Sequence, residues 1–398
     1  MELAKRMQRL GTENAFKVLT EVNKLKSEGK DIISFAIGEP DFDTPENIKL
    51  AGINAIKNNF THYNPSAGIP SIRTEIAEHI SATRKISVSP EEVVVTPGGK
   101  PIIFFSLFAL INPGDEVIYP NPGFPIYESI IDFIDAVAVP IPIVEEKNFS
   151  IDVDHLESII SPKTKMIILN APHNPTGGII EKEDLMRIAE LAIKHDITIF
   201  SDEIYSGIVY GGSFESIFSI PEMKERTIIL DGFSKTYAMT GWRLGYGIFP
   251  KKIASNIANL VTNSVSCTAT FTQLAGLEAL NGPQTDSNNM AAVFEERSKL
   301  IVEGLNDIKG VSCLKPKGAF YVFPNVTEAC KNLGFESSAR LQQYLLHEGG
   351  VAVLPRTSFG VKNKGETQEY IRLSYAASNE AILNGLARIK KAIERKNI

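Results

Sequence analysis

The chain of 398 residues is 43% hydrophobic and 22% charged, an ordinary globular composition that disfavours the disordered, collagen-like and disulfide-scaffold classes. Its formal net charge is −6 and it has no long basic block, so we expect small-molecule partners and no nucleic acid. Cys267, Cys313 and Cys330 form no CxxC pair, so neither a disulfide framework nor a metal site is predicted.

The amino-terminal segment, MELAKRMQRL, lacks the apolar core of a signal peptide, and no window of about 18 apolar residues follows it. We therefore expect a cytoplasmic protein with no membrane partner. The first 43 residues hold a helical stretch and then the run IISFAIGEPDF.

From about residue 92, helical stretches alternate with the apolar runs EVVVT, EVIYP, AVAVPIPI, KMIILN, ITIFSD, TIILD and GYGIF. Such strands are typical of a mostly parallel sheet that is covered on both faces. Beyond about residue 285 come a long charged helix near 286–306, a short strand in AFYVF and a strand in EYIRLSY. We predict an α/β fold with a large doubly wound domain over 44–285 and a smaller α+β domain from 1–43 plus 286–398.

A glycine pair opens the first helix of the predicted sheet domain. Gly98-Gly99-Lys100 follows the strand VVVT, and Pro101 suits the first helical position. Free N–H groups at a helix start favour a phosphate, so a phosphate site is predicted here. It is not a Walker loop, because Pro101 stands where Ser or Thr is required. The GxGxxG, HExxH and GxSxG patterns of dinucleotide-binding, zinc-protease and serine-hydrolase sites are not found.

Polar residues follow three later strands. Asn174 lies in LNAPHNPTGG, Asp202 and Tyr205 lie in SDEIY, and Lys235 and Arg243 lie in SKTYAMTGWRLGY. Taken singly, these residues would be read as turn, helix-cap or solvated side chains. Neighbouring strand ends converge in such sheets, so we expect the groups to line one crevice. The small or apolar residues that flank Lys235 would lower its pKa, and the guanidinium of Arg243 suits a phosphate. Together the two residues fit a phosphorylated aldehyde.

The combination GEPDF, THYNPSAG, NPTGG, SDEIY and SKTYAMTGWRLGY resembles the class I and II aminotransferases of the fold-type-I pyridoxal-phosphate superfamily, in their aspartate aminotransferase-like branch. The similarity runs from about Ser34 to Tyr375. It implies a homodimer that uses pyridoxal 5′-phosphate, held as a Schiff base on Lys235, for ping-pong transfer of an amino group between an amino acid and a 2-oxo acid.

The resemblance also implies roles around the cofactor ring. Lys235 would carry a proton between the substrate Cα and the cofactor, and Asp202 would keep the pyridine nitrogen protonated. Asn174 and Tyr205 would hydrogen-bond the phenolate oxygen. Phe124, in NPGFP, would stack on the ring.

Further roles concern the phosphate and the substrate. The phosphate would be held by Gly99, Lys100, Ser234, Arg243 and, from a neighbouring subunit, Tyr63. Arg372, in IRLSY, would clamp the substrate α-carboxylate with help from Asn174 and Gly38. Lysine in a GGK setting is associated in this branch with the distal carboxylate of a substrate, so Lys100 favours aspartate or glutamate as donor and 2-oxoglutarate or oxaloacetate as acceptor. Its alternative role is to add positive potential beside the phosphate.

Other specificities remain open, among them alanine, aromatic and prephenate aminotransferases and a lyase on the same scaffold. A pyridoxal-phosphate-binding sensor without turnover is a further alternative, but it would need a DNA-binding domain that the short segment before the first motif does not provide. Two residues need structural placement. Arg356, in VLPRTSFG, stands where many relatives carry glycine, which implies a changed loop or a second cation near the entrance. His173 is interpreted as a loop residue rather than a catalyst.

Overall fold

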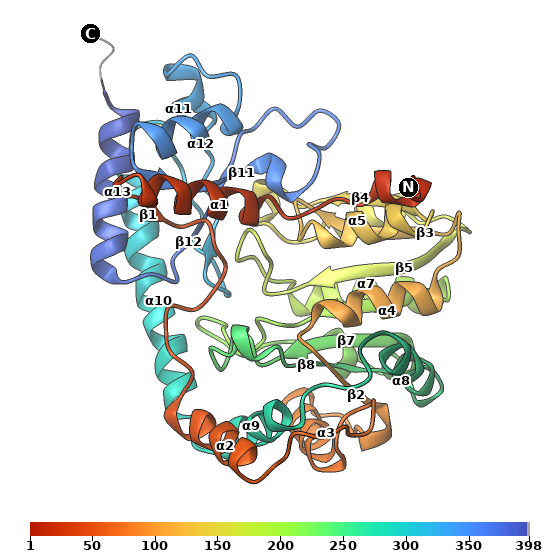
Figure 1. Ribbon diagram of the computed structural model, residues 1–398. Helices are drawn as coiled ribbons and strands as arrows, with labels where there is room; N and C mark the ends of the chain where they lie inside the picture. Colours follow the sequence, from red (N-terminus) through yellow and green to blue (C-terminus); the bar gives the residue numbers. More distant parts are fainter. Residues whose placement is uncertain (396–398) are drawn as a thin grey trace.

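The computed structural model describes residues 1–395 and is built on a seven-stranded sheet with the order β2-β8-β7-β6-β5-β3-β4 (Figure 1). Only β8 runs antiparallel to its neighbours, which confirms the predicted mostly parallel sheet. Each strand coincides with one of the apolar runs of the sequence. The strands are β2 (Val93–Thr96), β3 (Glu116–Asn121), β4 (Val137–Pro142), β5 (Thr164–Asn170), β6 (Thr198–Asp202), β7 (Thr227–Gly232) and β8 (Gly245–Ile248).

Helices bury both faces of this sheet because its strands are apolar at successive positions. In β5, Met166 and Ile168 belong to the core beneath α4 (Lys100–Leu110), α5 (Ile126–Phe133) and α8 (Lys251–Val265). Ile167 and Leu169 point to the opposite face, and there they pack with α6 (Val153–Ile159) and α7 (Lys182–Lys194). A third core lies between the β2 and β8 edge of the sheet and the helices α2 (Glu46–Lys57), α3 (Pro70–Arg84) and α9 (Thr270–Asn281).

The carboxyl-terminal part surrounds a small antiparallel sheet with the order β11-β12-β9 (Leu354–Pro355, Ile371–Ser374 and Tyr321–Val322). The amino-terminal residues join this part, because β1 (Ile33–Ser34) pairs in parallel with β10 (Val351–Ala352). Figure 1 shows α1 (Asn14–Ser27) lying beside the same region. The remaining helices of this part are α10 (Thr285–Asn306), α11 (Thr327–Asn332), α12 (Ser338–His347) and α13 (Asn379–Ile393).

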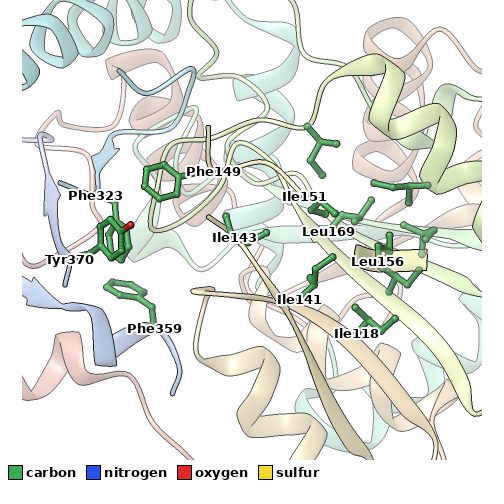
Figure 2. Close-up of a cluster of buried hydrophobic side chains, with 14 of the residues drawn as sticks. Ile118, Ile141, Ile143, Phe149, Ile151, Leu156, Leu169, Phe323, Phe359 and Tyr370 are labelled. Carbon is green, nitrogen blue, oxygen red and sulfur yellow. The ribbon is translucent and has the colours of Figure 1, made fainter. Parts of the chain in front are cut away.

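An aromatic cluster connects the two regions (Figure 2). Phe323 and Tyr370 stack with ring centroids 5.0 Å apart, and Phe149 and Phe359 meet this pair edge-on. The cluster is continuous with aliphatic side chains of the central sheet, so it fixes β12 relative to that sheet. Within residues 1–395, no helix is both long and apolar enough to cross a membrane.

Candidate active site

A cavity of about 540 Å³ opens where β5, β6 and β7 end, beside the start of α4. Strand ends are where ligands bind in open α/β sheets. The cavity brings together almost all of the residues that the sequence singled out: Gly38, Gly99, Lys100, Phe124, Asn174, Asp202, Tyr205, Ser234, Lys235, Arg243 and Arg372. Tyr63 does not line it and is 89% exposed, so its assignment to the site of a neighbouring subunit stays a prediction.

Lys235 follows β7 and extends its ammonium into the cavity. Its Nζ donates a hydrogen bond to the carbonyl oxygen of Gly38 at 2.6 Å. The same nitrogen lies 5.9 Å from the ring centroid of Tyr205 and 5.8 Å from that of Phe320. Because burial disfavours the charged form, the pKa of Lys235 falls to about 8. A minor fraction of this amine, about a tenth at pH 7, is therefore a neutral nucleophile.

Asp202 is the last residue of β6 and is only 4% exposed. Its Oδ2 accepts a hydrogen bond from the Tyr127 hydroxyl at 2.6 Å, and its Oδ1 accepts one from the Ile204 amide at 3.3 Å. Burial raises the pKa of Asp202 to about 6, although both hydrogen bonds oppose the rise. A protonated ring nitrogen beside this carboxylate would supply the charge partner that a buried anion needs.

The hydroxyl of Tyr205 shares a hydrogen bond of 2.7 Å with that of Tyr321. Tyr321 also lines the cavity, although the run AFYVF predicted only a strand and gave no sign of a site residue. A Cβ added to Gly38 would lie 2.0 Å from the Tyr321 hydroxyl oxygen, so the close approach of the two segments requires glycine. Beside them, the backbone N–H of Asn174 donates a hydrogen bond to the side-chain oxygen of Asn170 at 3.0 Å, which fixes the NPTG loop to β5.

Arg372 lies in β12 and is 4% exposed. Its Nη1 donates to the Asn174 side-chain oxygen at 3.2 Å, and its Nη2 donates to the Ala36 carbonyl. The guanidinium carbon lies 4.6 Å from the ring centroid of Tyr321 and 5.1 Å from that of Phe359. Within residues 1–395 its Nε has no hydrogen-bond partner, and no carboxylate forms an ion pair with the group. This buried cation is thus arranged to receive an anion from outside the chain.

A compact cradle lies at the amino-terminal end of α4. Gly98 has φ +85°, and a Cβ there would lie 2.2 Å from Nη2 of Arg243. A Cβ on Gly245 would lie 2.6 Å from the Gly99 amide nitrogen. The backbone at both positions therefore approaches its neighbours as only glycine allows. With Ser234, the cradle supplies a guanidinium, a hydroxyl and helix-start N–H groups, which together fit the phosphate of the cofactor that the resemblance implies.

Arg356 is fully buried and does not line the cavity. Its Nε and Nη2 donate to the two carboxylate oxygens of Glu366 at 2.6 and 2.8 Å, and Nη2 also donates to Asn121 at 3.1 Å. The bidentate pair with Glu366 neutralises the charge of Arg356, and the hydrogen bond to Asn121 joins the loop after β11 to the end of β3. Of the two interpretations of Arg356, the second cation near the entrance is therefore wrong.

His173 is 3% exposed, and its Nδ1 is hydrogen-bonded to the Thr176 hydroxyl at 2.8 Å. Burial lowers its pKa to about 3, so the ring is neutral. It does not line the cavity, which confirms its interpretation as a loop residue.

Glu13 is a further residue of the site that no sequence pattern indicated. The segment from Glu13 to Phe16 lines the cavity, and the Glu13 carboxylate accepts a hydrogen bond from Nζ of Lys100. No spacing or motif relates these two residues, because they lie far apart in the sequence and meet only in the folded chain.

Comparisons with known proteins agree with this geometry. The model of the family "Aminotransferase class I and II" matches residues 30–389. The chain is 40% identical to a protein of Aquifex aeolicus named "Probable aspartate/prephenate aminotransferase", over 98% of both chains. It is 36% identical to an aspartate aminotransferase of Geobacillus stearothermophilus, over 100% of both chains. The structure of an aspartate aminotransferase from Thermus thermophilus with maleate matches with a TM-score of 0.92 and 35% identity, covering 98% of this chain and 100% of that one. The chain therefore belongs to the class I and II aminotransferases, which use pyridoxal phosphate.

Proposed function

We propose that this protein transfers an amino group from aspartate or glutamate to a 2-oxo acid, either 2-oxoglutarate or oxaloacetate, in two half-reactions. The observation that carries the proposal is that one cavity brings together the Lys235 amine, the Asp202 carboxylate and the Arg372 guanidinium, which has no carboxylate partner within residues 1–395. The names of the relatives support the acidic substrates. So does the maleate in the Thermus structure, because maleate is a dicarboxylate.

Lys235 is proposed to act twice. Its amine, whose pKa of about 8 leaves it partly neutral, would hold the cofactor through the aldehyde group. The same amine would take a proton from the substrate Cα and return it elsewhere, as a general base and then a general acid. Bound pyridoxal phosphate supplies an electron sink for the charge left at Cα.

Four neighbours are proposed to fix the reacting groups. Asp202 keeps the ring nitrogen protonated, and Tyr127 holds that carboxylate in place through its 2.6 Å hydrogen bond. Tyr205 hydrogen-bonds the phenolate oxygen. Arg372 binds the substrate α-carboxylate as a planar fork, so that the Cα proton faces Lys235.

The assembly is proposed to be a homodimer. Tyr63 is 89% exposed, and Leu50, Ile53 and Phe60, which precede it in the chain, are 47%, 44% and 48% exposed. These apolar side chains favour an interface. There, Tyr63 of the partner subunit would reach the phosphate cradle.

We also propose that the chain is divided into the two predicted domains. The first, at 44–285, contains the seven-stranded sheet, and the second, at 1–43 plus 286–398, contains the two small sheets. A cytoplasmic location stays a prediction from the sequence.

The test is a screen of amino donors against the purified holoenzyme, with conversion of the bound cofactor to its amino form followed by absorbance. Aspartate or glutamate should give the fastest conversion, and 2-oxoglutarate or oxaloacetate should reverse it. Preference for alanine or an aromatic amino acid as donor would contradict the assignment of acidic substrates. So would preference for prephenate as the oxo-acid acceptor. Release of ammonia would indicate a lyase. No conversion by any donor would indicate a sensor.

A further inference from the structure

Lys100 does not point into an empty part of the cavity. Its Nζ bonds to the carboxylate of Glu13 and lies 5.6 Å from the ring centroids of both Phe16 and Phe124. The Glu13 side chain is 15% exposed, whereas that of Lys100 is 42% exposed. One carboxylate and two aromatic rings thus surround the ammonium that the resemblance to the aspartate aminotransferase-like branch assigns to the distal carboxylate of the substrate.

Glu13 immediately precedes α1 and occupies its N-cap position, yet its side chain makes no capping hydrogen bond. Asp, Asn, Ser and Thr are the usual residues there, because their short side chains reach the first free N–H groups. The longer Glu13 side chain is instead committed to the cavity. Its partner in the described chain is Lys100, and α1 gains nothing from it as a cap.

The charge of Glu13 reaches the reacting groups. Burial lowers the pKa of Lys235 and of Arg372, and the Glu13 carboxylate opposes this shift at both residues. A distal carboxylate placed near Lys100 would therefore meet an anion that already uses the same ammonium. Two carboxylates that share one cation in a partly dry site repel each other.

A neutral substrate side chain presents the opposite problem. If Lys100 had no carboxylate partner, a neutral substrate side chain would cover part of its ammonium without supplying a charge partner, which is unfavourable. With Glu13 in place, the cation is already neutralised and the two rings offer an apolar surface. The pair therefore suits a site that accepts both kinds of donor.

We infer that Glu13 is a specificity-determining residue: its carboxylate neutralises Lys100 when the substrate side chain is neutral, and it gives way when a distal carboxylate takes its place. The inference rests on the proposed function. In this inference, the Glu13 carboxylate competes with the distal carboxylate of the substrate for Lys100 and so reduces the selectivity for acidic donors.

The test compares Glu13→Gln with Lys100→Met and with the double variant. Glu13→Gln keeps the shape and removes the charge. It should raise kcat/KM for aspartate and lower it for alanine and phenylalanine, so that the acidic-to-neutral ratio rises about tenfold, the effect of one charge-assisted hydrogen bond. Lys100→Met should lower the ratio. In the double variant, the glutamine should add nothing to the effect of the methionine, because Glu13 acts through Lys100.

Binding provides a second readout. Calorimetry on the holoenzyme should show that Glu13→Gln tightens succinate, a dicarboxylate, and weakens butyrate, the monocarboxylate of equal length. Glu21→Gln is the matched control, because Glu21 lies on α1 and pairs with His347 outside the cavity. It should leave both affinities unchanged.

An unchanged ratio in Glu13→Gln, with normal thermal unfolding, would overturn the inference. The inference would also be overturned if Glu13→Gln changed the acidic-to-neutral ratio equally in the wild-type protein and in Lys100→Met. Failure of the proposed function would appear in the wild-type protein itself: the holoenzyme would prefer a neutral donor to aspartate and glutamate, or none of the donors tested would convert its cofactor.

Discussion

Two buried arginines of the carboxyl-terminal part should respond in opposite ways to substitution. Arg372→Lys keeps a positive charge but removes the planar fork proposed to hold the α-carboxylate. Each charge-assisted hydrogen bond is worth about 1.5–3 kcal/mol, so KM should rise roughly ten- to a hundredfold for donor and acceptor alike. Stability should change little, because Arg372 makes only two hydrogen bonds within the described chain and leaves its Nε free.

Arg356→Met is the matched variant. It leaves Glu366 without its bidentate partner in a buried pair, and breaking such a pair costs about 3–5 kcal/mol. KM should change little, since Arg356 does not line the cavity. Urea unfolding and initial rates with both substrates measure the two effects. The reasoning would be refuted by a normal KM in Arg372→Lys, or by a raised KM with normal stability in Arg356→Met.

Three further outcomes are expected. Asp202→Asn should lower kcat more than it raises KM, because a neutral amide cannot stabilise a protonated ring nitrogen, and near-normal turnover would show another role. In the cofactor-free protein, the rate at which Lys235 is acylated should rise with pH with a midpoint near pH 8, since the lowered pKa makes about a tenth of the amine neutral at pH 7. A midpoint near the ordinary pKa of 10.5 would contradict the desolvation of Lys235. Tyr321→Phe removes the hydroxyl that pairs with Tyr205 and should shift the pH dependence of the holoenzyme's visible absorbance while KM is kept. Tyr321→Leu also removes the ring beside Arg372 and should raise KM, so equal KM values in the two variants would argue against that ring contact.

The sheet was predictable because its strands are nearly continuous apolar runs bounded by turns. The site residues at strand ends were predictable for a related reason, since parallel strands bring their carboxyl ends to one edge. Lys235, Asp202 and Asn174 meet there although they are distant in sequence. The motifs of the family added Arg372, which by itself would have been read as a surface residue beside a strand.

Other features depend on packing that no local pattern encodes. The buried Arg84 pairs with Glu203 and Asp231, which adjoin Asp202 and the β7 end, yet α3 is distant from both in sequence. Burial raises the pKa of Asp231 to about 7, although Arg84 opposes the rise. Glu13 likewise reaches Lys100 only because the amino terminus lies against the cavity. Such contacts between distant segments form only in the folded chain, and no periodic pattern of residues in the sequence predicts them.

The most direct test of the proposed chemistry is the identity of the amine that holds the cofactor. Borohydride reduction of the holoenzyme, followed by digestion and mass spectrometry, should place the cofactor adduct on the peptide that contains Lys235. Lys235→Ala should unfold normally and carry no adduct. An adduct on Lys100 or on any other lysine in the wild-type protein would contradict the assignment of the site.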